Sequence, residues 1–324
     1  MRVQGLIVTA PQEVDRQQFQ LGDPDPNTVV VRVTACGLCT WEQRVYRGAK
    51  ATYPFWGGHE LCGIVEHVGA GVSAAVKPGD LVAAALMDRC RSCRWCWTGL
   101  DNHCSYTHPR RPDHLPAGPR GLSTHMVLRP EKLVPLDPSL GLRRGALLEP
   151  LACVLRAIRR SGLKAGNLAV VIGMGTLGLL HAEALRAMGV EVVGCEPDAP
   201  DGLSLDVVKD TGGADAVFCT RGGAASIEAA VKACARGGTV VLFQSIPGCG
   251  SVALDANDIH YREIAVIGSI GQRMEDLWQA KMMVELNPAL LDALNVELVP
   301  HDSPREAFDR SLDHSVNRVL VTFD

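Results

Sequence analysis

The sequence lacks an apolar run long enough to span a membrane and has no excess of positive charge. None of its hydrophobic stretches reaches the about 18 residues that a membrane helix needs. Its 32 lysines and arginines are outnumbered by 36 aspartates and glutamates, which leaves a net charge of −4. Such a charge gives no electrostatic case for binding nucleic acid or an anionic membrane. We therefore expect neither as a partner.

The N-terminus also lacks the apolar core and the cleavage site of a secretory signal peptide. Residues 1–7 have the pattern of a β-strand instead. We therefore expect a reducing, cytoplasmic setting, in which disulfides are rare. The length of 324 residues suggests about two domains, each large enough to bury its own core.

Cysteine, in contrast, is abundant, and four of the twelve cysteines are closely spaced. Two successive C-x-x-C steps and a seven-residue gap place four thiolates within reach of one tetrahedral ion. The alternatives are a disulfide cluster, which the expected compartment disfavours, or four unrelated buried thiols. The spacing predicts a structural zinc site made of Cys90, Cys93, Cys96 and Cys104.

The pattern of the chain changes near Leu147. Before it, short β-like runs such as 29–33, 64–68 and 81–85 alternate with turn signals. After it, apolar strands without polar alternation are separated by helices, which predicts a doubly wound parallel sheet. The expected strands are 169–172, 191–195, 214–219, 239–243 and 264–267, with helices at 177–188 and 225–235. Two further helical stretches precede a final strand at 318–323.

A glycine-rich turn follows the first of these buried strands. It has the G-x-G-x-x-G spacing of dinucleotide-binding folds, and the helix that follows favours phosphate at its N-terminus. Glu196 ends the next strand 23 residues after Gly173, where a carboxylate can bind ribose hydroxyls and repel a 2′-phosphate. We therefore predict NAD rather than NADP; the alternative is a turn without a ligand. The expected cofactor-binding residues are Gly173, Gly175, Thr176, Leu177, Gly178 and Glu196.

Cys39 and the pair His59–Glu60, within Gly-Gly-His-Glu-Leu, form a second candidate metal group. Three protein ligands and one open position are how catalytic zinc is held. The order of Cys39, Gly-His-Glu, the four-cysteine lobe and the glycine fingerprint resembles the zinc-dependent medium-chain dehydrogenases, the relatives of alcohol, sorbitol and threonine dehydrogenases. The resemblance extends from the N-terminal strand to the C-terminal Val-Leu-Val-Thr-Phe.

This resemblance implies an α/β fold with two domains. A GroES-like β-barrel catalytic domain would comprise 1–150 and 269–324, and a shortened Rossmann domain would comprise 151–268. Catalysis is expected in the cleft between them. The family also implies two zinc ions per chain and assembly into a homodimer or homotetramer.

The resemblance further implies a set of ligands for the catalytic zinc: Cys39, His59, Glu60 and Glu149. Glu149, followed by Pro-Leu, falls where alcohol dehydrogenases proper carry a second cysteine and sorbitol- and threonine-type relatives carry glutamate. That oxygen ligand favours polyol, sugar or cyclitol substrates. The alternative for Glu149 is a carboxylate at a helix N-terminus, since Pro150 suits the first helical turn.

Two features depart from the family. Many members have Ser or Thr two residues after the ligand cysteine and often a His three residues later, which form a proton relay; here Trp41 and Arg44 occupy those positions. An indole N–H can only donate, so the usual relay is absent. Thr40, Glu42, Glu60 or a water could take the proton instead. Trp41 could line the substrate pocket or pack beneath the site.

The second departure is a short nucleotide domain. Only 17 residues separate Glu196 from the strand that begins near Ala214, where relatives fit a helix, a strand and a helix. Residues 197–202 are expected to form a loop and 203–210 one short helix. One βα unit is therefore predicted to be missing at the sheet edge beside the adenosine, and NAD affinity is expected to be modest.

Taken together, the sequence predicts a zinc-dependent oxidoreductase that transfers a hydride between a small secondary alcohol or its carbonyl product and NAD. The alternatives are an NADP(H)-dependent aldehyde or ketone reductase, a redox-inactive ligand-binding relative, and zinc hydrolysis or lyase chemistry. Zinc hydrolysis or lyase chemistry needs no dinucleotide, so it would not explain the glycine fingerprint. The predicted catalytic residues are Cys39, Thr40, His59 and Glu60.

Overall fold

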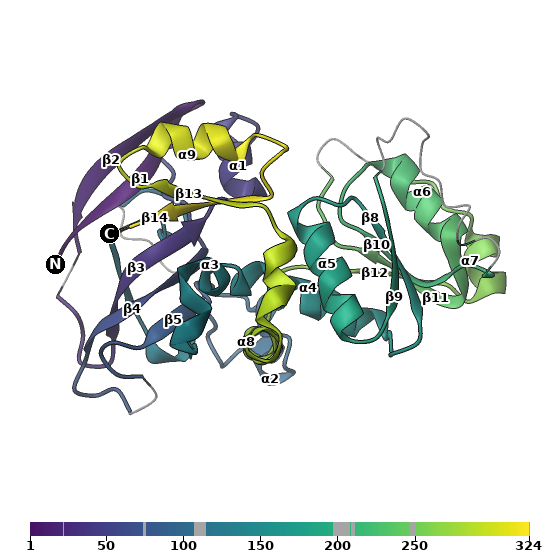
Figure 1. Cartoon of the computed structure of the whole chain (residues 1–324), viewed down its shortest axis with the longest axis horizontal. Helices are drawn as coiled ribbons and strands as arrows, with labels where there is room; N and C mark the ends of the chain where they lie inside the picture. Colours follow the sequence, from purple (N-terminus) through teal and green to yellow (C-terminus); the bar gives the residue numbers. More distant parts are fainter. Residues whose placement is uncertain are drawn as a thin grey trace. The chain divides into compact units, whose positions relative to one another are not determined.

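The structure is a computed structural model of the chain, and it describes residues 1–21, 23–73, 76–106, 115–196, 208, 211–246 and 251–323. The chain divides into two compact units (Figure 1). The first comprises Met1–Pro150 and Arg273–Asp324, and the second comprises Leu151–Gln272.

The first unit is built on strands. Seven of them form one mixed sheet in the order β13-β14-β3-β4-β5-β7, with β6 also pairing with β3, and β1 and β2 form a separate antiparallel pair. All pairings in the larger sheet are antiparallel except that of β13 with β14. The strands are β1 (Arg2–Ala10), β2 (Glu13–Gln20), β3 (Val29–Gly37), β4 (Glu60–Val68), β5 (Leu81–Ala84), β6 (His125–Leu128), β7 (Leu133–Pro135), β13 (Val296–Pro300) and β14 (Arg318–Thr322).

The core of this unit consists of apolar side chains from both sheets and the loops that cross them. Trp56 is almost fully buried at its centre, and its indole Nε1 donates to the carbonyl of Leu122 at 2.9 Å. Its ring stacks on Phe19 with 4.4 Å between the ring centroids. A polar atom on a large buried ring is thus satisfied, as burial requires.

The second unit contains the parallel sheet that the sequence predicts. Its strand order is β12-β11-β10-β8-β9, and every neighbouring pair is parallel. The strands are β8 (Leu168–Ile172), β9 (Glu191–Cys195), β10 (Ala214–Cys219), β11 (Cys234–Leu242) and β12 (Ala265–Gly268). Helix α5 (Thr176–Ala187) contacts β8 and β9, and α6 (Ala224–Ala233) contacts β10 and β11. The predicted α/β fold is therefore confirmed.

Strand β9 lies at one edge of this sheet among the described residues. The predicted loss of the βα unit that would pair with it stays a prediction, because most of the segment between β9 and β10 lies outside the described residues. The short helix expected at 203–210 and the loop at 197–202 fall largely outside the described residues.

The remaining α-helices are α1 (Thr40–Tyr46), α2 (Arg94–Trp97), α3 (Gly141–Ala146), α4 (Leu148–Ser161), α7 (Ala256–Arg262), α8 (Met274–Leu286) and α9 (Pro304–Ser311). Short 3₁₀ helices are η1 (Asp101–His103), η2 (Pro130–Lys132), η3 (Pro138–Leu140) and η5 (Pro288–Ala293). Across the described part of the chain, no helix combines the length and apolarity needed to cross a membrane.

A buried histidine makes the second unit sensitive to acid. His181 of α5 is fully buried, its Nδ1 lies 2.7 Å from the carbonyl of Leu177, and its ring packs on Phe218 and Phe243. Because a carbonyl only accepts, Nδ1 carries the proton of the neutral ring. Burial lowers the pKa of His181 to about 4, although the hydrogen bond to Leu177 opposes the shift.

We expect the stability of the protein to fall as the pH drops from about 6.5 to about 4. In that range the unfolded state takes up a proton at His181 that the folded state excludes, at a cost on the order of 3 kcal/mol. Unfolding in urea at several pH values would measure this slope. His181→Gln should flatten it, whereas the matched variant His260→Gln, at an exposed position of α7, should not. An unchanged slope in His181→Gln would refute this assignment.

Candidate metal centres and cofactor site

Cys39 lies just after β3, at the N-terminal cap of α1. Its Sγ accepts the backbone N–H of Trp41 at 3.2 Å, while the carboxylate of Glu42 accepts the backbone N–H of Cys39, also at 3.2 Å. This reciprocal capping fixes both side chains at the first turn of the helix. Burial raises the pKa of the Cys39 thiol to about 11, and the Glu42 charge adds to the effect. A bound metal would have to displace that proton.

His59 precedes β4 and faces both of these side chains. Its Nε2 lies 3.5 Å from Cys39 Sγ, and its Nδ1 lies 3.5 Å from Glu42 Oε1. Glu42 is fully buried and also accepts the backbone N–H of Gly58 at 2.9 Å. Burial favours the protonated form of Glu42, but His59 and the hydrogen bonds from Cys39 and Gly58 outweigh it and hold its pKa at about 2. Glu42 is therefore an anion that orients the imidazole.

Glu60, the first residue of β4, is held by a buried ion pair. Its Oε1 lies 3.2 Å from Arg318 Nη2, and Arg318 also donates to the carbonyl of Leu38 at 2.9 Å. Its Oε2 is buried, with no hydrogen-bond partner among the described residues. A Cβ at Gly37 would lie 2.3 Å from this oxygen, so a larger residue there would displace the Glu60 carboxylate. Burial raises the pKa of Glu60 to about 7, although Arg318 and His59 oppose the shift.

The structure brings the predicted ligands of the catalytic zinc into two overlapping groups. The ligand atoms of His59, Glu60 and Glu149 lie within 4.8 Å of one another, and so do those of Cys39, Glu42 and His59. His59 belongs to both groups. One sulfur, one imidazole nitrogen and carboxylate oxygens are a donor set that suits zinc. The buried Glu60 Oε2 supplies an oxygen ready for a metal, so the residues fit the ion.

The relay positions are occupied as the sequence indicates. Thr40 is exposed at the first residue of α1. The ring of Trp41 lies 5.9 Å from the His59 ring and 5.4 Å from Phe55, and the Lys50 ammonium lies 4.6 Å above it. Trp41 thus borders His59 and packs against the core at the same time. The two roles considered for it are compatible.

The four cysteines of the lobe converge as well. Their sulfur atoms all lie within 4.8 Å of one another, and none forms a disulfide. Backbone N–H groups of Cys93 and Ser92 donate to Cys90 Sγ at 3.2 and 3.5 Å, and that of Tyr106 donates to Cys104 Sγ at 3.4 Å. Hydrogen bonds from Ser92 lower the pKa of Cys90 to about 6. These donors favour thiolates, the form in which cysteine binds zinc.

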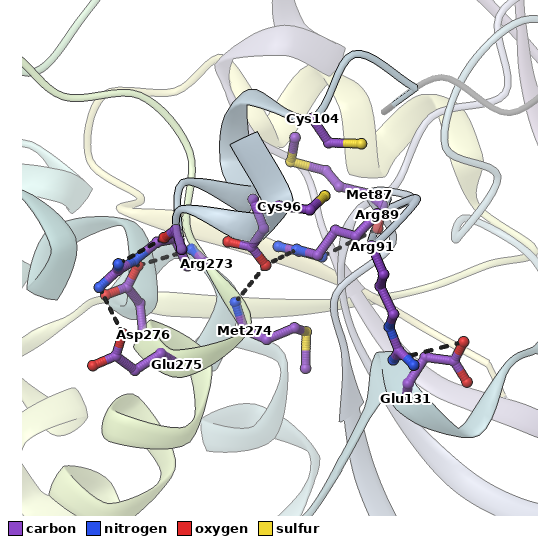
Figure 2. Close-up of polar contacts among 12 residues, drawn as sticks. Met87, Arg89, Arg91, Cys96, Cys104, Glu131, Arg273, Met274, Glu275 and Asp276 are labelled. Atoms are coloured by element: carbon purple, nitrogen blue, oxygen red, sulfur yellow. Dashed lines mark hydrogen bonds and ion pairs between the residues drawn. The ribbon is translucent and has the colours of Figure 1, made fainter. Parts of the chain in front are cut away.

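The lobe also holds the start of α8. Arg273 donates to the carbonyl of Gly99 at 2.8 Å, and its guanidinium lies beside Glu275 and Asp276 (Figure 2). Asp101 of η1 accepts the backbone N–H of Met274 at 3.5 Å and pairs with Arg89 at 2.6 Å. Loss of order in the lobe would therefore release the first turn of α8.

A cavity of about 840 Å³ lies beside this lobe. Its lining includes Cys90, Cys96 and Arg273 and does not include Cys39 or His59. It therefore belongs to the lobe and not to the reactive cluster, which consists of the two overlapping groups formed by Cys39, Glu42, His59, Glu60 and Glu149.

The glycine-rich turn has the geometry that a dinucleotide needs. Gly173 has a φ of +90°, which favours glycine, and a Cβ at Gly178 would lie 1.8 Å from the Gly173 carbonyl, so the helix packs closely on the strand. A Cβ at Gly175 would meet nothing within 4 Å among the described residues, which leaves space above the turn. Thr176 and Leu177 begin α5 directly after it. The turn thus fits a pyrophosphate.

Glu196 has partners that the sequence did not reveal. Its Oε1 accepts the backbone N–H of Met174 at 2.6 Å, and its Oε2 lies 3.4 Å from Arg221 Nη1. Arg221 follows β10, so the cation comes from another strand and not from the residues next to Glu196. The one signal for this contact is that the carboxyl ends of parallel strands meet at the same edge of a sheet.

Comparison with known proteins adds an independent line of evidence. Residues 25–138 match the alcohol dehydrogenase GroES-like domain. The (R,R)-butanediol dehydrogenase of Bacillus subtilis is 30% identical over 282 residues, which cover 77% of this chain and 79% of that protein. The L-galactonate-5-dehydrogenase of Escherichia coli is 24% identical over 98% of this chain and 96% of its own length.

A solved structure shows the same fold. A protein from Sinorhizobium meliloti 1021, described as a zinc-binding dehydrogenase and bound to NADP, aligns with a TM-score of 0.85 at 23% identity. The alignment covers 99% of both chains. At this level of identity the likeness concerns the fold alone.

Proposed function

Because this chain belongs to the zinc-dependent medium-chain dehydrogenase/reductase family and is a zinc-type alcohol dehydrogenase, we propose that it oxidises a polyol, sugar or cyclitol-like secondary alcohol with NAD. The observation that carries the proposal is that His59 shares one group of candidate ligands with Cys39 and Glu42 and a second with Glu60 and Glu149. In this proposal Cys39, His59 and Glu149 would hold the catalytic zinc, and the four-cysteine lobe would hold a structural zinc. When bound, the catalytic zinc supplies a Lewis acid that lowers the pKa of an alcohol, and NAD supplies the hydride acceptor.

The protein's own residues then have distinct tasks. Glu42 accepts the backbone N–H groups of Cys39 and Gly58 and lies 3.5 Å from His59 Nδ1, so it fixes the donors and has little capacity left for a proton. Arg318 holds Glu60 in place through one carboxylate oxygen. These contacts keep the donor atoms in position before any substrate arrives, which lowers the cost of reaching the reactive geometry.

Glu60 is the best-placed acceptor for the alcohol proton. Thr40 is exposed at the start of α1, and Trp41 can only donate. Glu60 Oε2, in contrast, is buried without a partner among the described residues, in the same group as His59 and Glu149. In this proposal Glu149 serves as the carboxylate ligand while Glu60 receives the proton.

Two observations support the proposed substrate class and cofactor. An oxygen ligand at Glu149 matches the sorbitol-type pattern, and the relatives named above act on butanediol and L-galactonate. Glu196 directly follows β9, at the position where a carboxylate binds the ribose hydroxyls of a dinucleotide. Use of NADP, by a reductase working in the opposite direction, is a second candidate because Arg221 lies beside Glu196. Assembly into a homodimer or homotetramer stays a prediction.

The proposal is tested by following NADH absorbance with the purified protein and a panel of polyols, cyclitols, sugars, sugar acids and simple alcohols. We expect turnover of a secondary alcohol with NAD, and loss of that turnover after removal of zinc by a chelator. Zinc-loaded protein that reduces NAD with no member of the panel and reduces carbonyl compounds only with NADPH would overturn it. A primary-alcohol preference would overturn the substrate class alone.

A further inference from the structure

The ion pair between Glu196 and Arg221 bears on which dinucleotide the chain accepts. We propose that Arg221 is a cofactor-selecting residue that pairs with the 2′-phosphate of NADP, so that the site accepts NADP alongside NAD. The inference rests on the proposed function in one respect only, namely that a dinucleotide binds at the glycine-rich turn.

Sheet topology explains how Arg221 reaches this place. Strands β9 and β10 flank β8, so the residues after all three strands meet around the turn that begins at Gly173. The backbone N–H of Arg221 donates to the carbonyl of Ile172 at 3.3 Å, and Thr220 Oγ1 donates to that of Gly173 at 2.7 Å. A Cβ at Gly173 would lie 2.3 Å from the Cβ of Arg221. The Cβ of Arg221 therefore lies directly beside the glycine-rich turn, and the hydrogen bond to Ile172 holds its backbone in place.

Both carboxylate oxygens of Glu196 already have partners. Its Oε1 is bonded to the backbone N–H of Met174, within the turn itself, and only Oε2 faces Arg221. The side chains of Arg221 and Glu196 are 50% and 39% exposed. An ion pair this exposed is weak, so a ligand that offers a better partner can open it at little cost.

The two cofactors present different groups to this pair. The 2′-hydroxyl of NAD can donate to Glu196 Oε2, whereas the 2′-phosphate of NADP can accept from the guanidinium of Arg221. A lone carboxylate would repel that phosphate. With Arg221 beside it, the pair carries no net charge, and the repulsion is largely cancelled. Discrimination between the two cofactors should therefore be small.

Adenosine fragments test the proposal without any need for catalysis. Dissociation constants of 5′-AMP and 2′,5′-ADP would be measured by calorimetry on the intact protein. The wild type should bind the two within about tenfold of each other. Arg221→Ala should weaken 2′,5′-ADP by about tenfold or more and change 5′-AMP by less than about threefold. Arg221→Lys should retain part of the affinity, and Glu196→Gln should favour 2′,5′-ADP.

The matched control is Arg186→Ala, which removes an arginine paired with Glu183 in the last turn of α5, away from the glycine turn. It should leave both constants unchanged. Equal losses for both fragments in Arg221→Ala, or equal losses in the control, would overturn the selecting role while leaving the proposed function intact. A wild type that binds 5′-AMP at least about a hundredfold better than 2′,5′-ADP would also overturn it. A wild type that binds neither fragment would contradict the dinucleotide part of the proposed function, and the inference would fall with it.

Discussion

Cys39→Ser is expected to abolish alcohol oxidation, with turnover at least about a thousandfold lower, while the fold and the metal of the four-cysteine lobe remain. The reason is that Cys39 is the only sulfur in the reactive cluster among the described residues. A serine hydroxyl stays protonated at neutral pH and is a poor zinc ligand. It could still cap α1, since serine is a preferred capping residue, so the helix should survive. Steady-state rates together with zinc content per chain would measure the effect.

The matched control for this prediction is Cys153→Ser. Cys153 is a partly exposed cysteine of α4 that belongs to neither group of candidate ligands. It should retain both turnover and metal content. Full activity in Cys39→Ser would contradict the metal mechanism. Loss of activity together with unfolding would show that the substitution acts on the stability of the fold and not on the chemical step. Circular dichroism separates these two outcomes.

The second large effect is expected from Cys93→Ser, which should lower the melting temperature by about 5–15 °C and remove the lobe's zinc. The N–H groups of the lobe point at its sulfur atoms, and without a metal four close thiols have little to hold them together. The disorder should spread to α8, because Arg273 and Met274 bond to Gly99 and Asp101 of the lobe. Calorimetric melting and amide hydrogen exchange over 90–104 and 273–278 would measure both.

Turnover per folded molecule at low temperature should change far less in Cys93→Ser than in Cys39→Ser. The two variants thus form a reciprocal pair, one affecting chemistry and the other stability. An unchanged melting temperature and zinc content in Cys93→Ser would show that the lobe holds no metal.

Sequence reasoning predicted the strands and helices of the parallel sheet well. The bounds of β9 and β10 coincide with the predicted 191–195 and 214–219, because each is a short apolar run that stops at turn-forming residues. Strand β11 begins at Cys234, before the predicted Thr239. The intervening Ala-Arg-Gly-Gly has no strand pattern, and it lies at an irregularity in the pairing with β10, between the Cys234 and Thr239 pairs.

The candidate site was predictable only in part. Cys39, His59 and Glu60 stand in a recognisable order, and the resemblance added Glu149. The residues that position them depend on contacts distant in sequence: Arg318 donates to a carbonyl 280 residues away, and Arg221 reaches Glu196 from a different strand. Glu42 is an exception, since its place three residues after a helix cap is a readable signal. From the residue pattern alone, that positioning role cannot be separated from a role as a base.

X-ray absorption at the zinc edge, combined with metal content, tests the central claim most directly. If Cys39, His59 and the carboxylates hold a second ion, the purified protein should contain about two zinc ions per chain. The average zinc should then have about 2.5 sulfur and about 1.5 nitrogen or oxygen neighbours, because one site has four sulfurs and the other has one. About one zinc per chain, with about four sulfur neighbours and no nitrogen or oxygen, would contradict the account.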